Sequence, residues 1–249
     1  MKDRHRGVAA AGALAIAILA VGCSAPTPSV RNPAALDEGQ PYSPVVDPAN
    51  FRDPIANDYF PLDPGLVTIF EGGDEHVEVT VTDDTKVIMG VTTHVVTDQV
   101  FVAGELQEDT IDWYAADNFG NVWYFGEQTA EYENGKVTST AGSWEAGVDG
   151  AQPGIVMLAD PEAGDRYRQE FYAGEAEDLA EVTAVTGSVK TPAGSWSGSD
   201  VLVTEEWTLL EPDVRERKTY VRGVGVVEIR TIKGGKELTT LTEAKFPAP

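Results

Sequence analysis

The stretch His76-Val77-Glu78-Val79-Thr80-Val81-Thr82 decides the fold, because valines occupy every second position and polar residues occupy the positions between. Side chains of a strand point alternately to its two faces, so this period of two places all three valines on one face. A strand with one apolar and one polar face is typical of an antiparallel sheet that covers a core on one side. We therefore expect a half-buried antiparallel strand here.

The same alternation recurs along the rest of the chain, for example in residues 122–125 and 167–171. Asn134-Gly135 is a strong signal for a two-residue hairpin, because both residues tolerate the positive φ that its turn requires. About eleven or twelve such strands fit between residues 66 and 243. The sequence therefore predicts a single all-β domain over residues 57–246, built as a curved antiparallel sheet or partly open barrel.

One segment, residues 174–185, is ambiguous between helix and strand. Leu179 and Val182 are three positions apart and can share one face of a helix. The residues from Leu179 onward also fit a strand. We favour the strand and leave the helix open.

The first 22 residues have the plan of an export signal. A basic head with three Lys or Arg residues precedes an apolar run over residues 8–21, which is too short to span a bilayer permanently. We therefore predict a signal peptide over residues 1–22. Cleavage there would make Cys23 the first residue of the mature chain.

The sequence Leu-Ala-Val-Gly-Cys at residues 19–23 resembles the lipobox of bacterial lipoproteins. The resemblance implies that Cys23 is lipidated, so that the mature protein lies outside the cytoplasm and is anchored to a bacterial membrane by its acyl chains. Ordinary secretory cleavage near the same site is the alternative. The partner expected on this basis is a lipid membrane.

Residues 23–56 form a proline-rich segment. Nine of the fifteen prolines of the chain lie between Ser24 and Pro64, where aliphatic residues are few and no periodicity is sustained. Such composition favours an extended, semi-rigid chain without a core of its own. We expect residues 23–56 to be a disordered tether that contributes nothing to the core.

The chain is strongly acidic, with 41 Asp and Glu residues against 18 Lys and Arg and a formal net charge of −23. Nucleic acid is therefore excluded as a partner, because phosphate binding needs clustered positive charge. The acidic surface suits cations as ligands or simply keeps the protein soluble. A single cysteine allows no disulfide within the chain, and its lipidation leaves no cysteine nucleophile.

Glu145 and Asp149 lie in a glycine-rich loop, residues 144–150. Carboxylates and backbone carbonyls are the ligands that Ca²⁺ prefers. The loop is therefore a candidate calcium site with Glu145 and Asp149 as metal ligands, and a purely structural loop is the alternative. No other cofactor is indicated.

A second acidic run begins at Glu108. On a strand, Glu108 and Asp112 share one face, whereas Asp109 and Asp117 share the other. No single cage of four carboxylates follows from this spacing.

Three tryptophans, Trp113, Trp123 and Trp144, are the candidate ligand-binding residues. Large amphipathic rings either fill the core of a sheet or line a concave pocket. We favour core filling for these rings and keep them, as the alternative, as the candidate contacts for a small apolar ligand.

Three segments carry a resemblance to a known family: DWYAAD at residues 112–117, GNVWYFGE at residues 120–127 and GSWEAGVDG at residues 142–150. They resemble an uncharacterised family of bacterial secreted proteins and lipoproteins, which implies export and no particular activity. Residues 59–62 and 223–227 are also similar to motifs of envelope β-proteins with a half-open barrel like that of the lipoprotein carriers.

The sequence therefore favours a membrane-anchored envelope lipoprotein that acts as a non-enzymatic binding or scaffold module, with an apolar ligand as one option. The alternative function is a carboxylate-dependent or metal-assisted hydrolase outside the cytoplasm, acting through carboxylates near Glu145 and Asp149. An open cavity favours the binding module, whereas a cleft that collects these carboxylates favours the hydrolase.

Overall fold

The computed structural model describes residues 32–36, 41–52 and 56–247. The predicted signal peptide and Cys23 lie outside these residues. Within the described part the chain is almost entirely β, as expected, with one short 3-10 helix at Pro48–Asn50. No helix in that part has the length and apolar character to cross a membrane.

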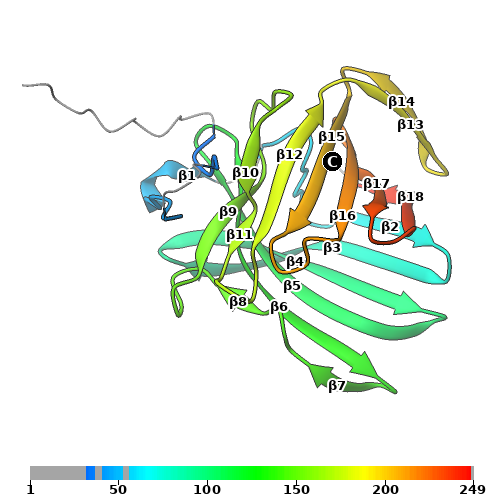
Figure 1. Cartoon of the computed structure of the whole chain (residues 1–249), viewed down its shortest axis with the longest axis horizontal. Coiled ribbons are helices and arrows are strands. Elements are labelled where there is room, and N and C mark those ends of the chain that lie inside the picture. The colour runs from blue at the N-terminus through cyan, green and yellow to red at the C-terminus, as the bar shows by residue number, and fades with distance from the viewer. Residues whose placement is uncertain (1–31, 37–40, 53–55, 248–249) are drawn as a thin grey trace, which may run out of the picture.

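Strands cover most of the described chain (Figure 1). Their bounds are β1 (Phe51–Arg52), β2 (Val67–Gly72), β3 (Glu75–Ile88), β4 (Val91–Val102), β5 (Glu105–Asp117), β6 (Val122–Glu133), β7 (Lys136–Ser139), β8 (Trp144–Glu145), β9 (Gln152–Met157), β10 (Arg166–Arg168), β11 (Glu170–Phe171), β12 (Asp178–Ala184), β13 (Gly187–Thr191), β14 (Gly194–Gly198), β15 (Val201–Thr208), β16 (Arg215–Val221), β17 (Gly225–Lys233) and β18 (Leu238–Lys245).

One 16-stranded antiparallel sheet contains all of these strands except the β13–β14 hairpin. Its order is β10-β12-β15-β16-β17-β18-β2-β3-β4-β5-β6-β9-β11, with β1, β7 and β8 paired at the side. Figure 1 shows the sheet curling into a barrel from which the β13–β14 hairpin projects. The predicted fold class is confirmed, and the strand count exceeds the expected eleven or twelve because several strands are only two to four residues long.

The two ends of the sheet are joined by one bent segment. β10 pairs with β12 and β11 pairs with β9, yet only Gln169 separates β10 from β11 in the chain. Gly154 in β9 makes this corner possible, because a Cβ there would lie 2.2 Å from the carbonyl oxygen of Gln169. The bend therefore brings the barrel close to closure.

The local predictions for turns and for residues 174–185 are settled by the backbone. Asn134 and Gly135 have φ of 52° and 71° and connect β6 to β7 as a hairpin, as predicted. Asp178–Ala184 is strand β12, so the helix left open there is wrong. β12 pairs with β10 on one side and β15 on the other, and these ladders satisfy its backbone groups as a sheet.

Described parts of the segment that we expected to be a free tether contact the barrel instead. Ala34 is fully buried, and Ala35 forms an antiparallel bridge with Tyr167. Leu36 N donates to Arg166 O at 3.2 Å. The physical reason is that the edge of β10 turned away from β12 needs hydrogen-bond partners, which these residues supply.

Tyr42, also in this segment, packs on the outside of the corner. Its hydroxyl donates to the carbonyl oxygen of Pro153 at 2.8 Å, and its ring meets the Phe171 ring edge-on at 5.8 Å. The Arg168 guanidinium lies 5.3 Å from the Tyr42 ring centre. Burial raises the pKa of Tyr42. Together with the pairing of β1 with β5, these contacts make residues 32–52 part of the packing of the barrel wherever they are described.

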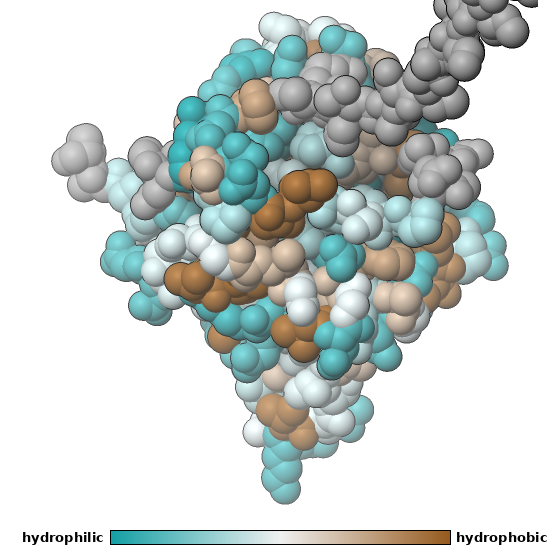
Figure 2. Space-filling model, turned by 90° about the vertical axis from the view of Figure 1, so that its left-hand side faces the viewer, coloured by the Kyte–Doolittle hydropathy of each residue, from teal (hydrophilic) through white to brown (hydrophobic). Residues whose placement is uncertain are grey.

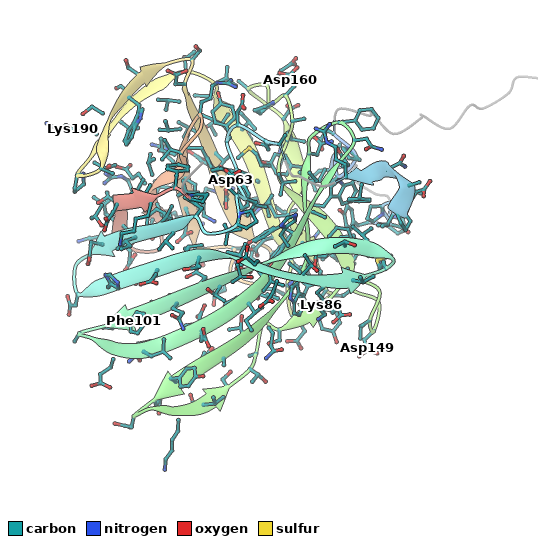
Figure 3. All side chains as sticks on the ribbon, turned by 180° about the vertical axis from the view of Figure 1, so that it is seen from behind. Asp63, Lys86, Phe101, Asp149, Asp160 and Lys190 are labelled. Carbon is teal, nitrogen blue, oxygen red and sulfur yellow. The ribbon has the colours of Figure 1, made fainter. Side chains whose placement is uncertain are left out.

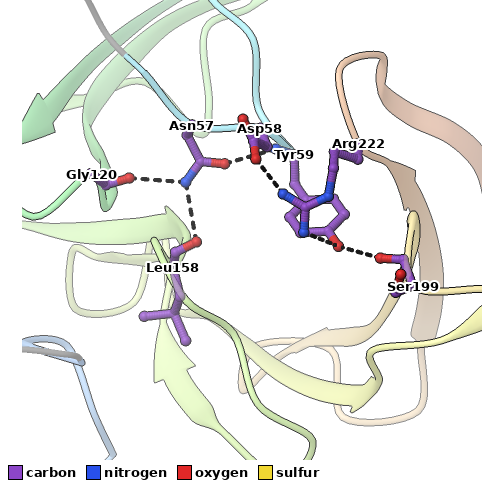
Figure 4. Close-up of polar contacts among 7 residues, drawn as sticks. All are labelled: Asn57, Asp58, Tyr59, Gly120, Leu158, Ser199 and Arg222. Carbon is purple, nitrogen blue, oxygen red and sulfur yellow. Dashed lines mark hydrogen bonds and ion pairs between the residues drawn. The ribbon is translucent and has the colours of Figure 1, made fainter.

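Residues 57–66 cross one end of the barrel and close it. Asn57 Nδ2 donates to the carbonyl oxygens of Gly120 and Leu158, at 2.9 and 3.1 Å (Figure 4). At the far end of the segment, Leu66 and Val81 are joined by a backbone hydrogen bond of 2.9 Å. The segment is therefore tied to strands on both sides of the barrel, and we call it the floor.

Tyr59 ties the floor to the β14–β15 and β16–β17 turns. Its hydroxyl donates to Ser199 O at 3.0 Å and accepts from Arg222 Nη2 at 3.0 Å (Figure 4). Arg222 also forms an ion pair with Asp58. Figure 2 looks at the molecule from the side, where hydrophobic residues are interspersed with hydrophilic ones rather than joined into one continuous apolar face.

Candidate functional site

The barrel holds a cavity of about 1000 Å³ between the floor and the hairpins at the other end. Phe60, Leu62 and Leu66 of the floor form its base. Glu75 and Glu237 line it as well. In Figure 3, Asp63 marks the floor and Phe101 marks the far end of β4. Pockets for small molecules have volumes of about 300 to 1000 Å³, so this cavity is large enough for a whole ligand.

One wall of the cavity is apolar. It is formed by side chains of β2, β3 and β17, which include Phe70, Val77, Val79, Val81 and Ile229. The register explains this wall, because Phe70 lies opposite Val77 on the neighbouring strand and both point inward. Val77, Val79 and Val81, which alternate with polar residues in β3, therefore face the cavity as the predicted apolar face.

The adjoining wall, on β4, β5 and β6, is acidic. Three rows of directly paired residues cross these strands, and each row continues a valine of β3. The rows are Val81-Val96-Asp112-Glu127, Val79-Asp98-Thr110-Thr129 and Val77-Val100-Glu108-Glu131. We call the carboxyl-bearing part of this surface the acidic wall.

Two pairs in the acidic wall place like charges directly opposite each other, Asp112 with Glu127 and Glu108 with Glu131. Like charges in such cross-strand positions destabilise a sheet. Burial adds to this effect, since a carboxylate removed from water loses its hydration. Unfavourable local arrangements of this kind are expected at functional sites rather than in the rest of a fold.

Tyr124 shows that the deepest of these pairs holds a proton. Its hydroxyl lies 2.5 Å from Asp112 Oδ1 and 2.6 Å from Glu127 Oε2. A phenol donates only one hydrogen, so the second contact requires a protonated carboxyl as donor. Burial raises the pKa of Asp112 well above its usual range and also raises that of Glu127, more than the hydrogen bond from Tyr124 lowers either. One of the two carboxyls is therefore neutral in this arrangement.

Asp98 occupies the junction of the two walls. It lies opposite Val79 of the apolar wall on one side and opposite Thr110 of the acidic wall on the other. Its Oδ1 atom is buried and has no hydrogen-bond partner among the described residues. Burial, and after it the charge of Glu108, raises the pKa of Asp98 to about 7.

Lys218 is the basic residue on the cavity wall in the described part of the chain. Its Nζ lies 2.8 Å from Glu206 Oε2, and Thr204 and Tyr220 donate to the other Glu206 oxygen at 2.7 and 3.1 Å. Burial raises the pKa of Glu206, but Lys218 and these hydrogen bonds lower it further than burial raises it. The charge of Lys218 is therefore already balanced by Glu206.

The three predicted ligand-binding tryptophans do not line this cavity. Trp113, Trp123 and Trp144 are 6%, 3% and 4% exposed and belong to the hydrophobic core. The Trp113 ring is covered by Lys86, and Trp144 Nε1 donates to Glu170 Oε2 at 2.9 Å. Core filling, the interpretation that the sequence favoured, describes their positions.

The structure does not bring Glu145 and Asp149 into the cavity either. Glu145 Oε2 lies 2.7 Å from Lys86 Nζ, and Asp149 is exposed in its loop with a φ of 50° (Figure 3). In the part of the chain that the structure describes, no group of three or more His, Cys, Asp or Glu residues is arranged to hold a metal ion. Calcium binding by this loop stays a prediction.

Sequence reasoning missed Asp98 and Glu127 as site residues. It noted that Glu108 and Asp112 share a face, but Ile111 and Trp113 occupy the other phase of the same strand. The binary pattern therefore did not indicate which of the two phases faces the interior. The available signal was the second alternation of polar residues, Glu127, Thr129 and Glu131, on the paired strand.

Comparisons with known proteins are as follows. No protein-family model and no curated protein matches the sequence. Among solved structures, a protein of Bacteroides fragilis NCTC 9343 described as exported and with a YmcC-like fold is 14% identical, with 77% of this chain and 100% of that chain covered and a TM-score of 0.46. A protein of Parabacteroides distasonis ATCC 8503 described as a lipoprotein is 12% identical, with coverages of 76% and 99% and a TM-score of 0.41.

Proposed function

We propose that this chain is an envelope lipoprotein that binds an amphipathic ligand inside its barrel without converting it chemically. Export and lipid anchoring are supported by the signal-like residues 1–22 and by Cys23. The observation that carries the binding role is the cavity of about 1000 Å³, which has an apolar wall and is not filled by side chains.

An apolar chain is the part of a ligand that the β2, β3 and β17 wall accommodates. Removing apolar surface from water contributes about 25 cal/mol per Å². Small barrels fill their interior with side chains, whereas a larger one encloses a cavity, and its open apolar wall leaves that contribution to a ligand. The lipid membrane that holds the anchor is a ready source of such chains.

The binding role is tested with N-phenyl-1-naphthylamine, a neutral dye that fluoresces in apolar surroundings. The protein carries Cys23→Ala, so that no acyl chain of its own competes for the cavity. We expect dye fluorescence with this protein and weaker fluorescence in Val79→Trp, because the indole takes up part of the cavity next to Asp98.

Val87→Trp is the matched control, because Val87 is 66% exposed and lies outside the cavity wall. It should bind the dye as the parent protein does. Equal fluorescence in the parent protein and in both tryptophan variants would place the dye elsewhere and contradict the proposal.

A carboxylate-dependent hydrolase is the second candidate, now with other residues than Glu145 and Asp149. Asp112 and Glu127 contact one hydroxyl and have raised pKa values, as acid and base pairs of hydrolases do. Mass spectrometry of ligands recovered after incubation separates the two functions. Unchanged ligand supports binding alone, whereas conversion that Glu127→Gln abolishes supports the hydrolase.

A further inference from the structure

We propose that the ligand of the cavity carries a cationic nitrogen group, which binds at Asp98 and Glu108 while its apolar chain lies against Val77 and Val79. This inference rests on the proposed binding function and specifies the chemical class of its ligand. The class is an alkylamine or alkylammonium amphiphile, not an anionic or neutral lipid.

The cavity wall carries far more acidic than basic side chains. Eight carboxyl residues line the cavity, against the one lysine whose charge Glu206 balances. The eight are Glu75, Asp98, Glu108, Asp112, Glu127, Glu131, Glu216 and Glu237. None of them forms an ion pair with Lys, Arg or His within the residues that the structure describes.

One of Asp112 and Glu127 is neutral, and an anionic head group would add to the negative charge of the other carboxylates in this cavity. A neutral head group would leave the charge as it is. A cationic group balances it, which is the arrangement that buried charges require. The cavity therefore selects for a positive ligand.

Asp98 is placed where the acidic and the apolar wall of the cavity meet. Its buried Oδ1 lacks a hydrogen-bond partner among the described residues, although an acceptor in this position normally has one. Asp98 lines the cavity and lies directly opposite Val79 of the apolar wall. An N–H group or ammonium of a ligand at this point pairs with the Asp98 carboxyl, which lines the cavity, while the attached chain continues onto the valines.

The spacing of the carboxyls fits an organic cation rather than a metal ion. A divalent metal needs several oxygen ligands that converge within about 2.0 to 2.6 Å of one point. The described residues contain no such group of three or more His, Cys, Asp or Glu. The carboxyls are instead spread along neighbouring strands, from Glu108 near the mouth to Asp112 near the floor, and this spread suits an extended amphiphile.

The experiment measures displacement of N-phenyl-1-naphthylamine by three probes with the same ten-carbon chain: decylammonium (decylamine, protonated at neutral pH), decanol and decanoate. The protein again carries Cys23→Ala, and the buffer contains about 150 mM salt to screen its overall negative charge. We expect the ammonium probe to bind at least about tenfold more tightly than decanol, since a charge-assisted contact changes affinity by about tenfold to a hundredfold. Decanoate should bind most weakly.

The cavity variant is Asp98→Asn with Glu108→Gln, in which both side chains keep their shape and lose their charge. Its ammonium preference should fall to less than about threefold while decanol binds as before. The matched control is Asp83→Asn with Asp84→Asn, which removes two exposed charges outside the cavity and should keep the preference. Should the double cavity variant fail to fold, Asp98→Asn alone replaces it, and its preference should drop at least about threefold.

Each outcome has a defined meaning. Equal binding of all three probes keeps the binding function and overturns the cationic ligand. Displacement by none of them overturns the binding function itself. An ammonium preference that persists in the cavity variant, or falls equally in the surface control, assigns it to the overall charge of the protein and overturns the role of Asp98 and Glu108.

Discussion

Replacement of Asp98 by asparagine should change how the stability of the protein depends on pH. The ordinary pKa of 3.8 is raised to about 7 in the folded protein, chiefly by burial. Between these values the unfolded chain has lost the proton that the folded protein still holds. The free energy of unfolding of the wild-type protein should therefore fall as the pH rises from about 4 to about 7, and then level off. An asparagine side chain at this position does not titrate, so the substitution should remove this contribution.

The magnitude follows from the size of the shift. About three pKa units correspond to about 4 kcal/mol, at about 1.4 kcal/mol per unit. Because Asp98 borders a cavity that opens to solvent, water screens part of this, and we expect about 2 kcal/mol. In a domain of this size that is a change of about 4 to 8 °C in the thermal midpoint.

The assay compares thermal midpoints at pH 5 and pH 8 by circular dichroism. This window covers about two of the three pKa units, so the wild-type midpoint should fall by about 3 to 5 °C more than that of Asp98→Asn. Asp149→Asn is the control, since it removes an exposed carboxylate and should keep the wild-type dependence. If wild type and Asp98→Asn show the same change, the carboxyl of Asp98 is hydrated in the folded protein and our reasoning about the junction of the walls fails.

Three further predictions concern the anchor, the corner and the N-terminal segment. Cys23→Ala should move the protein from the membrane fraction to the soluble fraction, and mass spectrometry that finds unmodified Cys23 on the mature wild-type protein would refute lipidation. Gly154→Ala should lower the thermal midpoint by about 4 to 8 °C, equivalent to about 2 kcal/mol, because its methyl group meets the Gln169 carbonyl; an unchanged midpoint would show that the corner is loose. Tyr42→Ala should destabilise the protein by about 3 kcal/mol in urea unfolding and Tyr42→Phe by about 1 kcal/mol, through loss of packing and of the hydrogen bond to Pro153. If the wild type and both Tyr42 variants were equally stable, residues 41–52 would contribute nothing to the stability of the barrel, as expected of a free tether.

The strands themselves were within reach of the sequence. The alternation around Val79 depends on local geometry alone, since successive side chains of any strand point to opposite faces. The turn at Asn134-Gly135 is equally local, because it depends on which residues tolerate positive φ. Residues 174–185 were harder, since Leu179 and Val182 fit either period, and pairing with β10 and β15 decided for the strand.

The candidate site needed information that no strand carries by itself. In β5, Ile111 and Trp113 alternate with Thr110 and Asp112, and the pattern shows two phases without saying which one faces the interior. Lys86 covers the ring of Trp113 on the outer face, and the acidic phase is left to line the cavity. The candidate ligand contacts named from the sequence, the three tryptophans, are therefore buried rings that do not line the cavity.

Sequence alone determined the all-β class, the acidic character and the signal-like start, because periodicity, composition and short motifs are properties of neighbouring residues. Only the tertiary structure decided that the floor closes one end, that residues 34–36 complete the edge of β10, and that Asp98 stands between valines and carboxyls. These features depend on contacts between residues far apart in the chain, and closure of the sheet fixes such contacts through hydrogen bonds and packing that local propensity does not specify.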